Sequence, residues 1–441
     1  MASDFLKVGR YKPGGIKLMA TFFLIIIYMA FISLGLPDSL LGTAWPLMQP
    51  EYGVSFDAAG IVSMFVAGGT IVSSLVSGFV IKRLGTGKIT FISCFMTAVS
   101  LLGISFSHSF IWLLFLAVPL GLGAGSVDSA LNNYVALHYK AHHMSWLHCF
   151  WGVGATLGPI IMSQFIAGQN SWRKGYLTVS MIQFFLVILL FLTLPLWKRM
   201  AKEFHHSSEN LNNTENIDDI DDKENLNKIE NLNKIDNLNR IENLDRIEER
   251  TKNPLKIRGV KFALASFLFY CGVESTMGLW GSSFLVGARG LSPAAAAKAV
   301  SLFYAGITVG RFITGFVTLK VSNTTLIRAG QATALVGSVL LLLPIPTIFT
   351  ISSFVIAGIG CAPIFPCMIH ETPMRFGKEN SQSIIGYQMA LAYTGSTFLP
   401  PILGFIAART TLWLFPLFIL VYIIIMISCS ERINLLMKGK M

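Results

Sequence analysis

Three acidic residues of this chain lie inside long apolar stretches, where charged side chains are rare. They are Asp38, Asp128 and Glu274, and Arg311 is the only basic residue in a comparable setting. An uncompensated charge in a bilayer costs roughly several kcal/mol, so such residues usually serve a function. A carboxyl group among apolar groups also binds a proton more tightly than in water. We therefore predict proton-binding sites at Asp38 and Asp128, with a neutral helix-packing role as the alternative for each.

The third acid, Glu274, and the basic residue Arg311 fall in neighbouring apolar stretches. Pairing would cancel both charges, and a lone buried ion is far more costly than a paired one. One interpretation is therefore a structural salt bridge. The other is a switch at the substrate site, in which substrate or a proton competes for Arg311 during a transport cycle.

The composition of the chain points to a bilayer. Hydrophobic residues make up 53% of the 441 residues, charged residues only 13%, and the mean hydropathy is +0.62, which is too apolar for a soluble protein. A membrane-spanning helix needs about 20 mainly apolar residues. We predict an all-α membrane protein with twelve spans in two pseudo-symmetric six-helix bundles. The spans are 16–43, 57–82, 89–107, 110–139, 143–168, 175–197, 258–285, 294–320, 325–343, 346–370, 383–408 and 411–430.

The basic residues predict an orientation for these spans. With both termini in the cytoplasm, fifteen Lys and Arg residues lie on the cytoplasmic side, without counting the central insert, against five outside. The formal charge of +11 is spread over the loops rather than gathered in one patch, so we expect no nucleic-acid partner. We predict a multi-pass protein of the cell membrane, in contact with lipid and monomeric.

A polar insert at residues 199–256 divides the chain into predicted domains at 1–198 and 257–441. A hexad occurs in it four times, as ENLNKI, ENLNKI, DNLNRI and ENLDRI from Glu224 onward. Leu and Ile alternate there at a strict spacing of three, which drifts around a helix of 3.6 residues per turn. We interpret the insert as a low-complexity cytoplasmic tether, with a partner-binding arm as the alternative.

The two halves resemble each other in sequence. GLPDSLLG, which contains Asp38, is similar to GVESTMG, which contains Glu274. SMFVAGGT from Ser63 is similar to SLFYAGIT from Ser301, and after a one-residue slip SGFVIKR is similar to TGFVTLK. Parallel repeats of this kind place a substrate site between the halves, near the midplane.

Glycine and proline surround the first acid. Gly35, Pro37 and Gly42 flank Asp38, and such residues loosen helical hydrogen bonding, which a membrane protein tolerates only against protein or water. Asp38 should therefore face a cavity.

Amide and aromatic residues provide candidates for substrate binding. In GLGAGSVDSALNN three glycines allow close helix packing, and Asn132 follows Asp128 by one turn on the same face. Aromatic side chains could stack on a polyhydroxylated ligand, although in membrane helices they more often pack or anchor at interfaces. The residues predicted to bind substrate are Asn132, His148, Trp280, Glu274, Arg311, Tyr387 and Gln388, with Trp45, Trp151 and Tyr393 as further candidates.

Motifs of enzymes and cofactor sites do not occur. We find no nucleophile constellation, phosphate-binding loop or metal-ligand spacing, so we expect neither enzymatic activity nor a cofactor. Glu371 and Arg375, four residues apart at the end of the tenth span, are predicted to form an exposed ion pair.

The stretch GFVIKRLGTGK between the second and third spans resembles the loop signature of the major facilitator superfamily. Gly78, Arg83, Gly85 and Lys88 occupy matching places, while Lys82 stands where that signature usually has an acid. The resemblance implies two six-helix bundles and alternating access.

More narrowly, Asp38 and the stretch VDSALNNYV resemble the fucose permease branch, the fucose–galactose–glucose:proton symporters. That branch carries an acid at each place, so the resemblance assigns proton coupling and sugar binding to Asp38 and Asp128. Asn132 also matches, and LHCFWGVGA places His148 in a substrate role. We predict a proton-coupled symporter of a sugar or similar polar small molecule. The alternatives are an exporter of drugs or metabolites and a non-transporting membrane sensor.

Overall fold

The computed structural model describes residues 13–139, 141–169, 171–214 and 254–437. Nearly all of these residues are helical, and this part of the chain contains twelve helical spans that are long and apolar enough to cross a membrane. The predicted number of spans is therefore confirmed. The four hexads of the insert lie outside the described residues.

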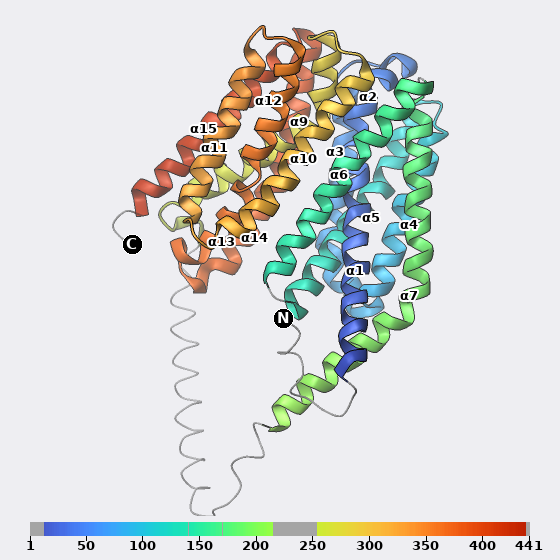
Figure 1. Cartoon of the computed structure of the whole chain (residues 1–441), viewed down its shortest axis with the longest axis vertical. Coiled ribbons are helices and arrows are strands. Elements are labelled where there is room, and N and C mark those ends of the chain that lie inside the picture. Colours follow the sequence, from blue (N-terminus) through green and yellow to red (C-terminus); the bar gives the residue numbers. More distant parts are fainter. Residues whose placement is uncertain (1–12, 140, 170, 215–253, 438–441) are drawn as a thin grey trace, which may run out of the picture.

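The first bundle contains the six spans before the insert (Figure 1). α1 and α2 together make one span that is interrupted at Ser39, between Asp38 and Leu40. The helices are α1 (Pro13–Asp38), α2 (Leu40–Tyr52), α3 (Ala58–Leu84), α4 (Thr86–Ser105), α5 (Phe110–His138), α6 (Ala141–Gln169) and α7 (Trp172–Thr214).

The second bundle follows a short 3-10 helix, η1 (Pro254–Lys256). Its fourth span is also divided in two, around Ala362 and Pro363. The helices are α9 (Val260–Gly287), α10 (Pro293–Val317), α11 (Asn323–Leu342), α12 (Thr347–Cys361), α13 (Ile364–Phe376), α14 (Lys378–Arg409) and α15 (Leu414–Met437).

Glycines bring the helices of the first bundle close together. A Cβ atom on Gly121 would overlap the carbonyl oxygen of Val66, and one on Gly125 would overlap that of Thr70, so α5 lies directly against the backbone of α3. The packing role predicted for the glycines before Asp128 is therefore confirmed. Gly154 of α6 contacts α1 in the same way, at the carbonyl oxygen of Ile32.

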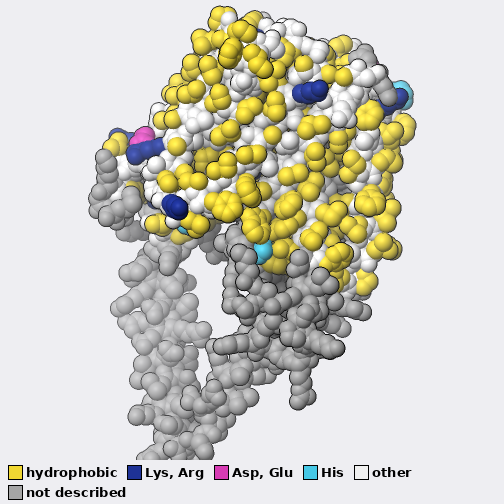
Figure 2. All heavy atoms as spheres, viewed as in Figure 1, with side chains coloured by type: hydrophobic (Ala, Val, Ile, Leu, Met, Phe, Trp, Pro, Cys, Tyr) yellow, Lys and Arg dark blue, Asp and Glu magenta, His cyan; other side chains and the backbone are white. Residues whose placement is uncertain are grey.

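The outer surface of the helices is largely apolar. Figure 2 shows hydrophobic side chains over most of the visible face, with Lys and Arg confined to a few places. Large hydrophobic residues on the outside include Leu75, Phe115 and Leu192, which are 80%, 70% and 69% exposed. Such a surface suits lipid rather than water, as expected for a multi-pass membrane protein.

The two bundles lie side by side, and the start of α1 and the end of α15 fall on one side of the molecule (Figure 1). We call this side, with Pro13 and Met437, the terminal face, and the opposite side, with the connections 53–57 and 410–413, the loop face. Near the loop face Phe56 packs on Trp280 at 4.4 Å between ring centroids. Arg409 pairs there with Asp57 at 3.6 Å. These contacts hold the bundles together on that side.

Candidate functional site between the two bundles

Asp38 lies at the break in the first span. Pro37 has no N–H to donate to the carbonyl oxygen of Ser33, which accepts a hydrogen bond from Gln183 Nε2 at 2.6 Å. The hydroxyl of Ser39, the residue after Asp38, donates to the carbonyl oxygen of Ala155 at 3.0 Å. Asp38 is exposed although it lies near the middle of a 31-residue span and its neighbours Pro37 and Ser39 are buried. The indole Nε1–H of Trp151 donates to its Oδ2 at 2.7 Å.

Acidic groups of both bundles lie near Asp38. Asp128 of α5 and Glu274 of α9 are both within electrostatic range of the carboxyl group. An exposed group with neighbours from both bundles lies in a space between them, deep in the molecule but reachable by water. The geometry thus agrees with the expectation that Asp38 faces a cavity.

Asp128 is held by one donor from each bundle. Asn132, one turn further along α5, donates its Nδ2–H to Oδ1 at 2.8 Å. Tyr393 of α14 donates its hydroxyl to Oδ2 at 3.1 Å. The bond to Tyr393 crosses from one bundle to the other, so Asp128 takes part in a contact between the bundles.

Glu274 of α9 and Arg311 of α10, both residues of the second bundle, form an ion pair. Arg311 Nη2 lies 3.5 Å from Glu274 Oε2, and the side chains are only 11% and 14% exposed. The same Nη2 donates to the hydroxyl of Tyr270 at 3.3 Å. The pairing, one of the two interpretations of these residues, is therefore present in the structure.

Trp151 connects the acid of the first bundle with the ion pair of the second. Its N–H bonds Asp38, while its ring lies 5.4 Å from Cζ of Arg311, within the range of a cation–π interaction. The ring also meets Tyr304 of α10 edge-on at 6.2 Å. His148, one turn earlier on α6, is half-buried and within electrostatic range of Arg311.

Six of the predicted site residues thus gather between the bundles, and three lie elsewhere. Trp280 is 1% exposed and donates to the carbonyl oxygen of Pro400 at 2.7 Å near the loop face. Gln388 is 1% exposed within the second bundle, where it accepts from Thr372 at 3.0 Å. Tyr387 is 38% exposed and lies on the same side of α14 as Phe398, which follows three turns later and is 49% exposed. We call this exposed side the outer stripe of α14.

Two residues at the site carry no strong signal in the sequence. Tyr270 precedes Glu274 by one helical turn, a spacing that could have identified it as a neighbour. Tyr304 falls in the repeated motif SLFYAGIT, but the matching residue in the first half is the apolar Val66, so the repeat does not indicate it. Trp151 and Tyr393 are predicted only as further aromatic candidates, yet they make the contacts across the interface.

The structure confirms the ion pair predicted for Glu371 and Arg375 but not its predicted exposure. The two side chains do form an ion pair, but they are only 10% and 13% exposed, so the predicted exposure is wrong. Arg375 also donates to Asn434 of α15 at 3.1 Å. The pair is enclosed because one face of α13 packs against α11 and α14, and hydropathy does not reveal which face that is.

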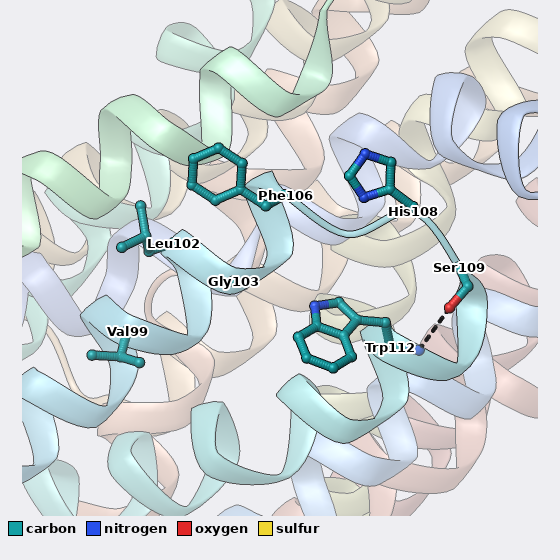
Figure 3. Close-up of a pocket in the computed structure, with 7 residues that line it drawn as sticks. All are labelled: Val99, Leu102, Gly103, Phe106, His108, Ser109 and Trp112. Atoms are coloured by element: carbon teal, nitrogen blue, oxygen red, sulfur yellow. Dashed lines mark hydrogen bonds between the residues drawn. The ribbon is translucent and has the colours of Figure 1, made fainter.

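A separate depression lies on the outside of the first bundle, where α4 ends and α5 begins. Figure 3 shows its lining, which contains no acid or amide. Its polar side chains are His108, Ser109 and Trp112, and Ser109 Oγ caps α5 by accepting the backbone N–H of Trp112 at 3.3 Å. None of the predicted site residues lines it.

The fold and the charged groups between the bundles define a class of membrane protein. The family model of the Major Facilitator Superfamily matches residues 21–209 and 262–432, and the chain belongs to this family. It is therefore a transporter and not an enzyme. The resemblance to the superfamily is confirmed, whereas the narrower resemblance to the fucose permease branch stays a prediction.

Relatives and solved structures agree with this assignment. Bypass of stop codon protein 6 of Saccharomyces cerevisiae is 24% identical over 405 residues, 88% of this chain and 77% of that protein. The glucose/mannose transporter GlcP of Bacillus subtilis is 22% identical over 170 residues, 38% of this chain and 42% of that protein. The cis,cis-muconate transport protein of Acinetobacter baylyi is 24% identical over 172 residues, 38% of this chain and 41% of that protein.

A solved structure shows the same fold. It is a bacterial homolog of the human lysosomal transporter Spinster in an inward-facing and unoccupied conformation. The TM-score is 0.64 at 11% sequence identity, over 95% of this chain and 97% of that chain.

Proposed function

We propose that the protein is a secondary active transporter that carries a sugar or similar polar small molecule together with protons. The observation that supports this most strongly is the pair of carboxyl groups between the bundles. Asp38 and Asp128 are each held by uncharged donors, an indole, an amide and a phenol. Either carboxyl can therefore accept a proton without leaving a buried cation unpaired, as a coupling site must.

The arrangement of the bundles supports alternating access. Among the described residues, the recorded contacts between the bundles lie at the level of Asp38 and Asp128 or nearer to the loop face. The space at the two acids is thus closed toward the loop face. Rocking of one bundle against the other would break the loop-face contacts and expose the same site to the opposite side.

The substrate class rests on polar groups at the site and on the relatives. Asn132 supplies an amide beside Asp128 and His148 an imidazole near Arg311, and such groups hydrogen-bond hydroxylated molecules. The names of two relatives, a glucose/mannose transporter and a cis,cis-muconate transport protein, both refer to small polar molecules. A sugar-like ligand at Asn132, His148, Glu274 and Arg311 fits these observations.

The excess of basic residues on one side supports an orientation. Fifteen Lys and Arg residues fall in the sequence segments expected on the cytoplasmic side, against five in the segments expected outside, which supports a cytoplasmic terminal face. In that orientation the space between the bundles opens toward the cytoplasm. We place the protein in the cell membrane as a monomer.

Flux measurements in proteoliposomes test the proposal. The purified chain is reconstituted with an external pH dye, and sugars are added outside one at a time. A symporter alkalinises the outside with its substrate, and Asp128→Asn abolishes this response because an amide cannot carry the proton. Glu431→Gln is the matched control, since Glu431 pairs with Arg328 far from the interface. Equal responses of Asp128→Asn and the control would overturn proton coupling at Asp128.

Deleting residues 206–250 separates transport from sensing. A transporter with a tether keeps its flux after the deletion. A sensor that signals through the insert binds ligand without flux and loses its output when the insert is removed. Retained flux in the shortened chain is the expected result.

A further inference from the structure

Arg311 uses few of its donors in the structure. A guanidinium group has five N–H donors in a planar fork that matches a carboxylate. The recorded polar contacts of Arg311 in the described part, to Tyr270 at 3.3 Å and to Glu274 at 3.5 Å, both use Nη2. The distance to Glu274 exceeds the usual 2.7–2.9 Å or so of an N⁺–H···O⁻ bond.

Another arginine of the same bundle shows what full pairing looks like. Arg328 donates Nε and Nη2 to the two carboxylate oxygens of Glu431, each at 2.6 Å. That pair is 51% and 38% exposed, whereas the Arg311 pair is almost enclosed. The long Arg311–Glu274 contact therefore lies in the more buried place, where an unpaired charge costs more free energy. A pair that served stability alone should be tightest there.

The free side of Arg311 faces the space between the bundles. Its guanidinium carbon lies 5.4 Å from the ring of Trp151 of the other bundle, and His148 is also within electrostatic range. No donor nitrogen of Arg311 is among the buried side-chain atoms that lack a partner in the described part of the chain. The unused donors are therefore not fully buried, and Trp151, which also donates to Asp38, lies beside the guanidinium group.

We propose that the transported molecule carries a carboxylate and that Arg311 binds it, an inference that rests on the proposed transport function. A neutral sugar could not replace Glu274, because its hydroxyls would leave a nearly buried guanidinium without a counter-charge. A carboxylate supplies the same charge as Glu274 and fits the planar fork with two parallel bonds. Hydroxyl groups on the same molecule would face Asp38 and Asn132.

Charge balance links this binding to proton uptake. When Glu274 takes a proton it releases Arg311, and the substrate carboxylate then pairs with the arginine. The pocket thereby gains one proton and one anion, so its net charge does not change. Without the proton, the anion would enter a site with three acids and one base, where repulsion opposes binding. A hydroxylated acid should therefore enter with one compensating proton per carboxylate.

Several titratable groups surround Glu274 and take part in any pH response. On its own helix they are Tyr270 and Cys271, and the adjacent elements contribute Tyr304 and Arg311 from α10, Cys361 from α12 and Asp38 from α1. Of these only Arg311 is a cation, so it alone provides an anion site.

Matched pairs of neutral and acidic probes test the proposal in the full-length chain. The pairs are glucose and glucuronate, galactose and galacturonate, and glyceraldehyde and glycerate, supplemented with other hydroxylated acids of three to seven carbons. Binding is measured as thermal stabilisation of the purified protein, and transport as uptake into proteoliposomes. We expect at least one acid to bind and to be transported, and its neutral counterpart to do neither.

Two variants locate the carboxylate. Arg311→Gln should weaken acid binding by at least roughly thirtyfold, while Arg328→Gln, the matched control, should not. Glu274→Gln mimics the protonated acid, so it should bind the substrate with a weaker dependence on pH and with one coupled proton fewer per carboxylate than the unchanged chain. Because Arg311→Gln could fail to fold, Arg311→Lys serves as a second variant, which keeps the charge but loses the fork.

The outcomes separate this inference from the transport function. Proton-coupled uptake of a neutral sugar, with the acids inert, would overturn the carboxylate while leaving proton symport intact. Acid transport that Arg311→Gln and Arg311→Lys leave unchanged would overturn the role of Arg311. If no probe of either kind binds or is transported, both the inference and the proposed substrate class fail.

Discussion

The two bundles carry an acid at matching places in their first helices, yet the partners of these acids differ. Asp38 accepts a hydrogen bond from the neutral indole of Trp151, whereas Glu274 pairs with the cation Arg311. The repeats SGFVIKR and TGFVTLK align Ser74 of α3 with Arg311 of α10. The first bundle therefore lacks the cation because a serine occupies the matching place.

This difference separates the expected roles of the two acids. Protonation of Asp38 breaks no ion pair, so its charge can change at little cost. Protonation of Glu274 leaves Arg311 without a counter-charge, which is expensive unless another anion arrives. Asp38 in the first bundle would thus bind and release a proton alone. Glu274, at the matching place in the second bundle, would bind a proton together with the binding of an anion to Arg311.

The largest effect should come from breaking the ion pair on the side of the acid. Glu274→Met leaves Arg311 without its counter-charge, and an arginine cannot lose its proton to escape the cost. We expect a loss of about 3–5 kcal/mol in unfolding free energy. Arg311→Met should cost less because Glu274 can become neutral. Reversible unfolding in mixed micelles measures both.

The double variant is the control for this asymmetry. Glu274→Met combined with Arg311→Met removes both charges and should recover most of the stability lost by Glu274→Met alone, since apolar pairs often replace buried ion pairs without loss. Additive losses would contradict the pairing. An equal cost for the two single variants would remove the proposed difference between the acids.

A smaller effect should come from Gly42 of the first bundle, which lies against its counterpart in the second bundle, Gly278. Gly42 and Gly278 match in the repeats, and a Cβ atom on Gly42 would overlap the carbonyl oxygen of Gly278 across the interface. Gly42→Val should therefore cost about 1–3 kcal/mol in the present arrangement. Under the proposed alternating access the bundles separate at the loop face, so this cost should shift the population toward a loop-face-open state.

Spin labels at Lys88→Cys and Lys320→Cys, both on the terminal face, report this shift as a shorter distance between the bundles. Gly68→Val is the matched control, since no atom lies within 4 Å of a Cβ built there. Identical distance distributions for the two variants would show that the glycine contact does not set the equilibrium.

The sequence predicts the fold more completely than the site. Hydropathy identifies all twelve spans because a bilayer demands long apolar helices, and the cost of charge singles out Asp38, Asp128, Glu274 and Arg311. It cannot show which face a helical residue occupies when all faces are apolar. The sequence therefore predicts Trp280, Tyr387 and Gln388 at the site, whereas in the structure they lie near the loop face, on the outer stripe of α14 and inside the second bundle.

The third prediction tests the neutral partner of Asp38. Trp151→Phe keeps an aromatic ring near Arg311 but removes the N–H that donates to Asp38. We expect a loss of about 1–2 kcal/mol in unfolding free energy, because water can reach Asp38 and replace part of the bond. Trp112→Phe is the control, since Trp112 is 52% exposed. A loss no larger than that of the control would mean that the indole does not stabilise the acid.

The smallest effect should come from the bond that joins the bundles. Tyr393→Phe removes the donor to Asp128 Oδ2, but Asn132 still donates to Oδ1 at 2.8 Å, so the acid keeps a partner. We expect the free-energy difference between the two arrangements of the bundles to change by about 0.5–1 kcal/mol. This corresponds to roughly a two- to fivefold change in the ratio of the two populations. Because the bond crosses the interface, the change should appear in the distance between the labels at 88 and 320 and not in the unfolding free energy. Tyr387→Phe, on the outer stripe of the same helix, is the control and should change neither the label distance nor the unfolding free energy. If Tyr393→Phe changes only the unfolding free energy, this bond stabilises the bundles without linking Asp128 to their movement.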